Sequence, residues 1–419
     1  MTDVQLPTAL GSGVSRRRFI QGSALVGFSA FLAACSGGTS GSQAAASIPI
    51  PTPPPESEAA NASPTPLPSP TGPLQFANWE AYIDLAGKAG DAGVYSPGSS
   101  PTIEQFKKQY GVDVNYQEKI NDNEEFYALI QPALSTGLSS GWDLIVMTDW
   151  MAARLISKGW IEKIDQSVVP NCVNNLRDAL KNQVWDTGND YHYPWQSGMT
   201  GIGYDTKGLK SANIPAPKSL KDLWAIKSDK VTFLTESRDT FGLGLLKLGK
   251  TADPATTTAD DLQAVHDDIA PLVQAGLRFT GNDYLADFAS RKVWAAMVWS
   301  GDLASSGDPS QIFVFPEEGT MVWTDNMLIP KGAEHKYTAE LMMNWVYDPK
   351  IAAQIEAYVY YVCPVKGADV EIAKIDDTAP QNPLIFPTAD IVAKQHNFQF
   401  LSADLENTLK DLFSDLQAT

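Results

Sequence analysis

The sequence predicts an α/β fold built on a mainly parallel sheet. Apolar stretches of strand length, such as residues 74–79 and 142–148, alternate with segments of helical periodicity such as residues 104–110. This alternation is typical of parallel sheets whose faces are covered by helices. The length points to two domains, because 419 residues are enough for two separate cores. Ligands of such sheets bind at the carboxyl ends of strands, where Trp79 and Thr148 lie.

The expected elements follow one another in a regular order. Up to residue 160 we expect strands at 74–79, 112–116 and 142–148 and helices at 104–110, 124–135 and 150–158. Later in the chain we expect strands at 230–235, 293–299 and 319–330 and helices at 219–224, 241–249, 259–276, 284–290, 338–345 and 402–416. Between the two parts, residues 193–204 are aromatic, then glycine-rich, then apolar, which indicates a strand that leaves one domain and enters the other. Their glycines lack the spacing of a dinucleotide-binding loop.

The charge of the chain argues against two classes of partner. Its formal net charge is −18 at pH 7 and its isoelectric point is about 4.6. Nucleic acids and anionic membrane surfaces repel such a protein, whereas a cationic ligand is compatible with it. The four histidines and three cysteines match no metal-binding or redox spacing. We therefore expect neither a metal nor a cofactor.

Residues 1–35 carry the features of a bacterial export signal. Residues 15–21 resemble a twin-arginine motif, residues 24–34 form an apolar run, and Cys35 ends a sequence similar to a lipobox. The apolar run is short for a membrane-spanning helix, and a single-span anchor is the alternative. We expect the mature chain to begin at a lipidated Cys35, which tethers it to the outer face of the cytoplasmic membrane, in the periplasm or at the cell surface.

Residues 36–73 predict a disordered stalk. They are rich in glycine, serine and alanine, and then in proline. Such sequence cannot bury a core and favours extended polyproline conformations. A stalk would hold the globular body away from the membrane and still let it reach a partner there.

Two pairs of residues predict a site for an ammonium group. Trp323 and Asp325 are two apart in an apolar strand, so their side chains point the same way. An indole face packs on methylene groups and attracts a cation, and the carboxylate pairs with its charge. Glu236 and Asp239 lie three apart at the end of a strand, where a turn would let both reach one ammonium group. The alternatives are a core tryptophan beside a strand-end aspartate, and a helix N-terminus whose acids pair with Arg238.

Seven segments of the body occur in an ordered set that is specific. They are Asn78-Trp-Glu-Ala-Tyr82 and residues 142–150, 193–203, 235–241, 297–302, 316–325 and 361–364. Together they resemble the extracellular solute-binding proteins of ABC importers, and among these the spermidine/putrescine-binding proteins. The resemblance runs from about residue 76 to the C-terminus. It implies a monomer that does no chemistry, captures a polyamine (spermidine or putrescine) and delivers it to a permease in the cytoplasmic membrane.

The resemblance also implies the architecture. The fold would be a two-lobed periplasmic-binding-protein clamshell, with hinge crossings and a ligand cleft between the lobes. Lobe one would comprise residues 74–196 and 326–378, and lobe two would comprise residues 197–325 and 379–419. Closure of the lobes would enclose the ligand.

Position by position, the resemblance implies the ligand-binding residues. The aromatic walls would be Trp79, Tyr82, Trp150, Trp299, Trp323 and Tyr361. The polar contacts would be Thr148, Glu236, Asp239, Asp325 and Gln399. Glu236 and Asp239 would hold one terminal amine, and Asp325 would lie nearer the middle of the ligand. These roles agree with physical chemistry, because a buried ammonium group is costly without a carboxylate and aromatic walls pack methylene groups.

The chain departs from the family at Ala81. Relatives often carry an acid just before the tyrosine of this motif. Glu80 and Asp149 are the candidates that would replace this acid. The far end of the cleft, and with it the length of the ligand, therefore stays open.

Several alternatives stay open at this point. The same clamshell could bind an amino acid-like amine such as 4-aminobutyrate, or a metal chelate, and a ligand carboxylate would need a basic residue such as Arg238. The adjacent Tyr360 and Tyr361 suggest ferric iron as a ligand, because another branch of the superfamily binds iron through adjacent tyrosines. A hydrolase would also use paired carboxylates in an aromatic cleft. Cys172 and Cys363 would either form a disulfide outside the cytoplasm or remain free thiols.

Overall fold

A single mixed sheet runs through the part of the chain that this computed structural model describes, residues 68–86, 95–96 and 98–419. Its strands are β1 Leu74–Trp79, β2 Val114–Ile120, β3 Leu144–Thr148, β4 Tyr193–Asp205, β5 Val231–Leu234, β6 Arg278–Thr280, β7 Ala295–Trp299, β8 Gln311–Val314, β9 Thr320–Leu328 and β10 Gln395–His396. Their order is β2-β1-β3-β9-β4-β7-β5-β6, with β8 paired to β4 and β10 paired to β9. The predicted export signal with Cys35 and most of the predicted stalk lie outside the described residues.

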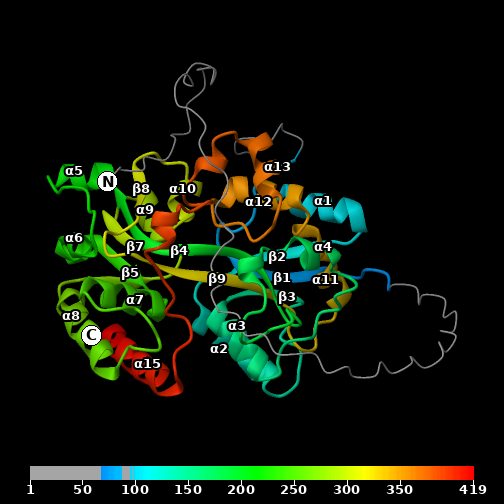
Figure 1. The fold of residues 1–419 in the computed structure, drawn as a ribbon, viewed down its shortest axis with the longest axis horizontal. Coiled ribbons are helices and arrows are strands. Elements are labelled where there is room, and N and C mark those ends of the chain that lie inside the picture. The colour runs from blue at the N-terminus through cyan, green and yellow to red at the C-terminus, as the bar shows by residue number, and fades with distance from the viewer. Residues whose placement is uncertain (1–67, 87–94, 97) are drawn as a thin grey trace, which may run out of the picture. The chain divides into compact units, whose positions relative to one another are not determined.

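Two groups of parallel strands are joined by two long crossing strands, β4 and β9 (Figure 1). β1 pairs in parallel with β2 and β3, and β5 pairs in parallel with β6 and β7. β4 and β9 are antiparallel to each other, and they pair antiparallel with β7 and β3, respectively. The parallel arrangement predicted from the sequence therefore holds within each group, and the hinge crossings add antiparallel pairs. We call the group with β1, β2 and β3 the first lobe, and the group with β5, β6 and β7 the second lobe.

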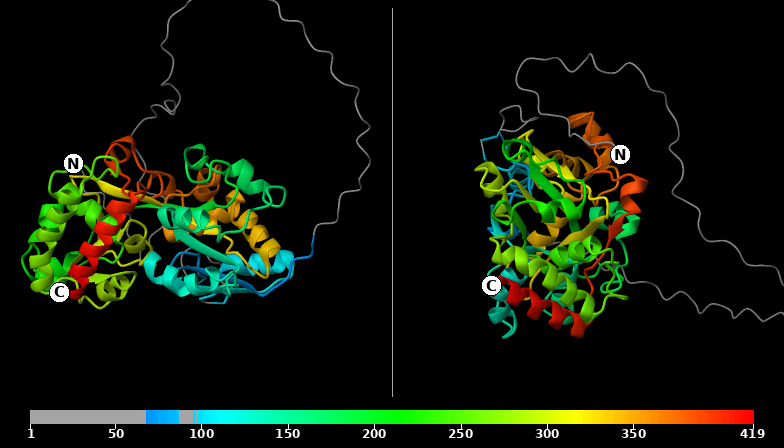
Figure 2. Two further views of the ribbon diagram at one scale, coloured as in Figure 1. Left: turned by 90° about the horizontal axis from the view of Figure 1, so that it is seen from below. Right: turned by 90° about the vertical axis from the view of Figure 1, so that its left-hand side faces the viewer.

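Helices cover the sheet and mostly follow the predicted order. Those between β1 and β4 are α1 Pro101–Tyr110, α2 Asn123–Leu134, α3 Asp149–Ser157, α4 Pro170–Asn175 and the 3₁₀ helix η2 Asp178–Leu180. Those between β4 and β8 are α5 Thr206–Ser211, α6 Leu220–Ala225, η3 Ser228–Lys230, α7 Ser237–Lys247, α8 Ala259–Gln274, α9 Tyr284–Ala289 and α10 Asp302–Ser305. Those after β9 are α11 Lys336–Val346, α12 Pro349–Val359, α13 Ala368–Ile375, η4 Ala379–Gln381, α14 Ala389–Val392 and α15 Ala403–Ala418. The last helix returns to the second lobe, where α15 packs beside α7 and α8 (Figure 2).

Local sequence explains where several helices begin and end. The Ser100 side chain accepts the N–H of Ile103 and caps α1, which Gly111 ends with a left-handed φ of 72°. Thr258 and Asp261 form a reciprocal capping box at the start of α8. Helix α7 begins at Ser237, four residues earlier than predicted, because Glu236 is already its N-terminal cap position.

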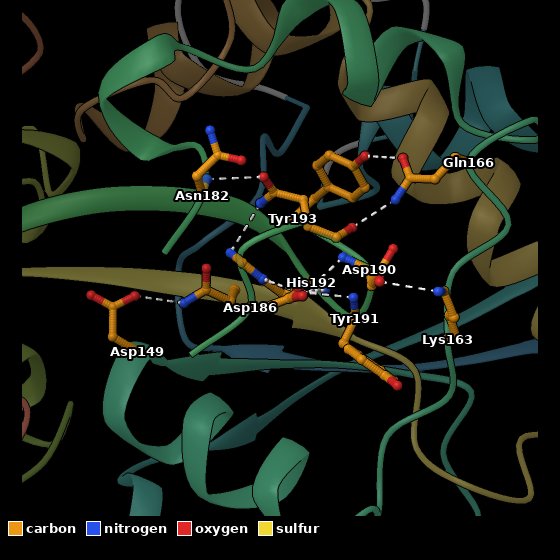
Figure 3. A network of polar contacts seen from close by, with 11 residues as sticks. Asp149, Lys163, Gln166, Asn182, Asp186, Asp190, Tyr191, His192 and Tyr193 are labelled. Atoms are coloured by element: carbon orange, nitrogen blue, oxygen red, sulfur yellow. Dashed lines mark hydrogen bonds and ion pairs between the residues drawn. The ribbon is translucent and has the colours of Figure 1, made fainter. Parts of the chain in front are cut away.

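A buried loop fixes the start of the crossing strand β4 (Figure 3). The carboxylate of Asp186 accepts the N–H of Tyr191 at 2.9 Å and Nδ1 of His192 at 2.7 Å. The hydroxyl of Tyr193, the first residue of β4, donates to Gln166 at 2.5 Å. Both partners of the Asp186–His192 pair are buried, so these bonds hold the loop in place before the chain crosses between lobes.

The core is made of the side chains that the apolar patterns predicted. Buried residues from both lobes and from the crossing strands form one continuous cluster, which includes Phe76, Leu144, Phe233 and Val298. Cys172 and Cys363 are free thiols buried in this core, so the alternative of a disulfide between them is wrong. None of the described helices combines the length and the apolar character needed to cross a membrane.

Candidate functional site

A pocket of about 450 Å³, counted with the open solvent at its mouth, lies where both lobes meet the crossing strands. Its lining residues are Trp79, Glu80, Tyr82, Thr148, Trp150, Glu236, Arg238, Asp239, Asn282, Trp299, Asp302, Trp323, Asp325, Tyr361 and Gln399. Trp79, Thr148 and Trp299 end the parallel strands β1, β3 and β7, and Glu236 follows β5 closely. The carboxyl ends of the strands thus supply much of the wall, as expected for this class of sheet.

All eleven predicted ligand-binding residues line this one cavity. They are Trp79, Tyr82, Thr148, Trp150, Glu236, Asp239, Trp299, Trp323, Asp325, Tyr361 and Gln399. Of the two acids considered as replacements at Ala81, Glu80 lines the cavity and Asp149 does not. The carboxylate of Asp149 instead accepts a hydrogen bond from the amide of Asn326 at 2.9 Å. The structure therefore assembles the predicted set, and its binding role remains a prediction.

Two cavity residues were missed from the sequence, Asn282 and Asp302. Asp302 lies three residues after Trp299, inside one of the segments that carry the family resemblance. An acid so close to the carboxyl end of a strand was a usable signal. Asn282 follows the short strand β6, which the sequence pattern did not reveal.

Aromatic rings form a continuous wall of the cavity. The ring of Trp299 lies 5.8 Å from that of Trp79 and 6.5 Å from that of Trp323, centroid to centroid. Tyr361 extends the wall, with its ring 5.6 Å from Trp323 and 5.1 Å from Tyr82. Most of these pairs are edge-to-face, which is a favourable geometry for aromatic rings. Such a wall packs well against a chain of methylene groups.

Two glycines make room for this wall. A Cβ at Gly198 of β4 would lie 2.5 Å from Cζ2 of Trp323 and 2.9 Å from Cδ1 of Tyr361. A Cβ at Gly301 would lie 2.5 Å from Cε2 of Tyr361. Any larger residue at either position would displace a ring of the cavity wall.

Two of the cavity acids are held by neutral hydroxyl groups. Asp325 accepts hydrogen bonds from Thr148 at 2.7 Å and from Tyr82 at 3.0 Å. Asp302 accepts a hydrogen bond from Tyr361 at 2.5 Å and another from Tyr284. These donors orient the carboxylates without neutralising their charge, so a cation is still required when the acids are ionised.

Glu236 and Asp239, the acids at the start of α7, accept hydrogen bonds from the first lobe and from the aromatic wall, respectively. Oε1 of Glu236 accepts the backbone N–H of Asn123 at 2.7 Å and its side-chain amide at 2.9 Å. Oδ2 of Asp239 accepts the indole N–H of Trp299 at 3.1 Å. Helix α7 does begin beside these acids, as the alternative predicted. Among the described residues, however, Arg238 forms its ion pair with Glu406 and not with either acid.

Three buried acceptor oxygens of the lining residues lack a donor. They are Oδ1 of Asp239, Oδ1 of Asn282 and Oε1 of Gln399. Buried polar atoms in proteins are nearly always hydrogen-bonded, because an unpaired one costs free energy. A ligand that brings N–H groups to these side chains would supply the missing donors.

Burial raises the pKa of the cavity acids. The pKa of Glu236 rises to about 8 and that of Asp325 to about 7, mainly because desolvation disfavours the charged forms. Burial likewise raises the pKa values of Asp239 and Asp302 to about 6. A bound cation would favour the ionised forms and lower all four pKa values.

Arg238 is the only basic residue among those that line the cavity in the described structure, and its guanidinium is already occupied. It lies 3.6 Å from the centroid of the Trp150 ring and donates from Nε to the backbone oxygen of Gln399 at 3.0 Å. Its Nη2 is 3.4 Å from the carboxylate of Glu406. The guanidinium therefore packs into the cavity wall, where these contacts already occupy it.

A profile of the bacterial extracellular solute-binding proteins matches residues 102–382, which is more than half of the chain. The chain belongs to this family. Its members bind solutes outside the cytoplasm for transport. The predicted two-lobed solute-binding fold is thereby confirmed, as is the predicted extracellular placement in its general form.

Two curated relatives of this solute-binding protein align over most of their length. The spermidine/putrescine-binding periplasmic protein of Salmonella typhimurium is 28% identical over 325 residues, which are 77% of this chain and 85% of the relative. The putrescine-binding periplasmic protein of Escherichia coli is 28% identical over 342 residues, with the same two coverages. Among solved structures, a spermidine/putrescine transporter substrate-binding protein of Streptococcus pneumoniae has a TM-score of 0.63 at 22% identity, and the match covers 84% of this chain and 99% of that one.

The histidines, cysteines and acids of this solute-binding protein do not gather as metal ligands. Within the residues that the structure describes, no group of three or more such side chains could hold a metal ion. Tyr361 lines the cavity, where its hydroxyl donates to Asp302 at 2.5 Å.

Proposed function

We propose that this protein is the substrate-binding component of an ABC importer and that it captures a polyamine, spermidine or putrescine, in the cavity between its lobes. The observation that supports this proposal is that the residues lining the cavity offer more hydrogen-bond acceptors than donors. Its wall presents acids and three buried acceptor oxygens without donors, and its one arginine is occupied. An ammonium group supplies three N–H donors and a positive charge, so it meets both requirements.

Each part of a polyamine has a matching part of the cavity. Glu236 and Asp239 would hold one terminal ammonium group, with the free oxygen of Asp239 accepting one of its N–H bonds. Asp325 would lie nearer the middle of the ligand, as expected from the sequence. Asp302 and Glu80 would receive the second terminal group, and thus take the place of the acid that is missing at Ala81. The aromatic wall would pack the methylene groups between them.

Arg238 argues against the alternative of an amino acid-like ligand such as 4-aminobutyrate. A ligand carboxylate in this acidic cavity would need a free cation, since burying it unpaired is costly. Arg238 is buried, and Trp150, Gln399 and Glu406 already contact its guanidinium. A ligand that carries ammonium groups without a carboxylate therefore fits the charges better.

The relatives support the same ligand class. The Salmonella relative is named for spermidine and putrescine, and the Escherichia relative for putrescine. Their alignment with this chain extends over most of both proteins. We propose no catalytic step, because the members of this family bind solutes for transporters.

The N-terminal sequence supports a location at the outer face of the cytoplasmic membrane. We propose that Cys35 is lipidated, that residues 36–73 tether the body to the cytoplasmic membrane, and that the protein acts as a monomer and docks there on a permease. The lobe boundaries that we propose are residues 74–196 with 326–378, and residues 197–325 with 379–419. They place the crossing strands β4 and β9 at the hinge.

Titration calorimetry tests the ligand. The protein would be prepared as the Cys35→Ser variant to prevent lipidation, and titrated with spermidine, putrescine, 4-aminobutyrate and ferric citrate. Binding of spermidine or putrescine with a micromolar or lower Kd, and of neither other compound, is the expected result. Silence to both polyamines from folded protein would refute the proposal, and the recovery of a chemically altered ligand would instead support a hydrolase.

A further inference from the structure

Two arginines enclose the ring of Trp150, a residue of the cavity wall. The guanidinium carbon of Arg154, one turn further along α3, lies 4.7 Å from the ring centroid. The guanidinium carbon of Arg238 in α7 lies 3.6 Å from it. Helix α3 follows β3 of the first lobe and α7 follows β5 of the second lobe, so the two arginines approach the ring from different lobes.

Glu406 of α15 reaches both arginines. Its carboxylate forms a hydrogen-bonded ion pair with Nη2 of Arg154 and lies 3.4 Å from Nη2 of Arg238. The carboxylate of Glu124 is a second partner of Arg154, at 2.9 Å from Nη1. Arg238 has no other carboxylate within ion-pair distance among the described residues, although its side chain is only 5% exposed. Burying a guanidinium is costly without a carboxylate, so Glu406 stabilises Arg238 in its place against Trp150.

The pair between Glu406 and Arg154 connects the lobes. Helix α15 packs on α7 and α8 of the second lobe, whereas α3 belongs to the first lobe. The pair therefore joins the two lobes in the arrangement seen here. Glu406 itself is not one of the cavity-lining residues.

We propose that Glu406 is a positioning residue for ligand binding. It joins Arg154 and Arg238 across the cleft, holds the closed lobes over Trp150, and so strengthens the binding of every ligand without touching any of them. This inference rests on the proposed function for its ligands, but not on which amine binds. Closure and binding are linked because a ligand held only in the closed state gains apparent affinity in proportion to the closed population.

The expected effect has a characteristic form. Glu406→Gln removes the charge and keeps the shape, so it should raise the Kd values of putrescine, spermidine and cadaverine about tenfold, a typical size for conformational coupling. All three Kd values should rise by the same factor, because only the closing equilibrium changes. The dissociation rate should increase, since the closed state opens more readily. Salt should weaken ligand binding less in the variant than in the parent, because the ion pair with Arg154 is partly exposed and screened by salt.

The test is titration calorimetry and stopped-flow dissociation of the full chain with these three amines. Asp411→Asn is the matched control, because Asp411 is an exposed acid of the same helix and its variant should bind like the parent. Arg154→Gln breaks the same bridge from the first lobe and should reproduce the result if Glu406→Gln does not fold. Unchanged Kd values, or Kd values that change by different factors for the three amines, would overturn the proposal.

Failure of the proposed ligand class can be told apart from failure of this inference. If the parent binds none of the amines, the polyamine proposal is wrong. Small-angle X-ray scattering of the ligand-free proteins then still tests the bridge. The Glu406→Gln protein should have a larger radius of gyration than the parent, and equal radii would overturn the inference.

Discussion

The indole nitrogen of Trp299 donates a hydrogen bond to one carboxylate oxygen of Asp239 at 3.1 Å, and the other oxygen of Asp239 has no donor. The aromatic wall thus orients an acid of the site directly. Because the indole uses one oxygen, we propose that the second accepts a hydrogen bond from the ligand. An ammonium group placed against Trp299 would both contact the ring and supply the missing donor.

The carboxylates are expected to carry much of the binding free energy. Asp325→Asn and Glu236→Gln should each weaken putrescine binding by about 2–5 kcal/mol, because each removes one partner of a buried charge pair. Titration calorimetry measures the change. Asp404→Asn, an exposed acid on α15, is the control and should bind like the parent. If both cavity variants bind like the parent, the ligand lies elsewhere.

Asp302 is expected to recognise the second ammonium group of a diamine. Asp302→Asn should weaken putrescine binding by about 2–5 kcal/mol, the range for a broken buried charge pair, and should leave n-butylamine binding nearly unchanged. Butylamine has the same carbon chain and one amine, so it isolates the second charge. Competition calorimetry with both amines measures the difference. Equal losses for the two ligands would mean that Asp302 shapes the cavity without contacting the far amine.

Ligand binding is expected to release protons near neutral pH. Burial raises the pKa of Asp325 to about 7 and that of Glu236 to about 8, so both are partly protonated in the free protein. A bound ammonium group favours the ionised carboxylates and lowers both pKa values. Affinity should therefore rise between pH 6 and 8, as fewer protons must leave. Calorimetry in buffers of different ionisation enthalpy measures the released protons, and identical apparent enthalpies would contradict this prediction.

The Asp186–His192 pair is expected to stabilise the fold without affecting the cavity. Asp186→Asn should lower the free energy of unfolding at pH 7 by about 1–3 kcal/mol, because it breaks a buried charged hydrogen bond. Burial alone would raise the pKa of Asp186, but the hydrogen bonds from His192 and the backbone outweigh it and lower the pKa below 3.8. An acid whose pKa is lower in the folded than in the unfolded state stabilises the fold at pH values above its unfolded-state pKa. This stabilisation is lost as the pH falls through the folded-state pKa.

Urea unfolding from pH 7 to 3 tests this account. The stability difference between the parent and Asp186→Asn should be present at pH 7 and shrink below pH 4. Burial lowers the pKa of His192 from 6.5, and the contact with Asp186 opposes this shift. Without Asp186 the native state resists protonation of His192 more strongly, so the stability difference should first widen as the pH falls through 6.5 and shrink only below pH 4. Putrescine affinity at pH 7 should be unchanged in the variant. A stability difference that continues to grow below pH 4 would contradict the proposed role of the pair.

The sequence pattern alone predicted the chemistry of the walls. Trp323 and Asp325 face one cavity because residues two apart on a strand share a face, and that rule needs no tertiary information. Asp239 and Glu236 were found because acids at the carboxyl end of a parallel strand lie where ligands bind. Asp149 was considered as a replacement for the acid missing at Ala81, but it follows directly after β3 as the first residue of α3 and pairs with Asn326 instead.

Only the tertiary structure decided which side chains share a space. Asp302 enters the cavity because α10 turns back beside Tyr284 and Tyr361, and Arg238 is occupied because α15 returns from the C-terminus to place Glu406 against it. These contacts join residues separated by tens to hundreds of positions, and no local periodicity encodes them. Short-range spacing by itself determined the α/β class, the strand that leaves one domain for the other, and the tryptophan and acids of the site at Trp323, Asp325, Glu236 and Asp239. The remaining aromatic wall and the two-lobed architecture came from the resemblance to the solute-binding family. Whether a charged group of the cavity can still bind a ligand depends on its long-range contacts. These contacts leave acceptor oxygens of the lining residues without a donor, whereas they give Arg238 a carboxylate partner.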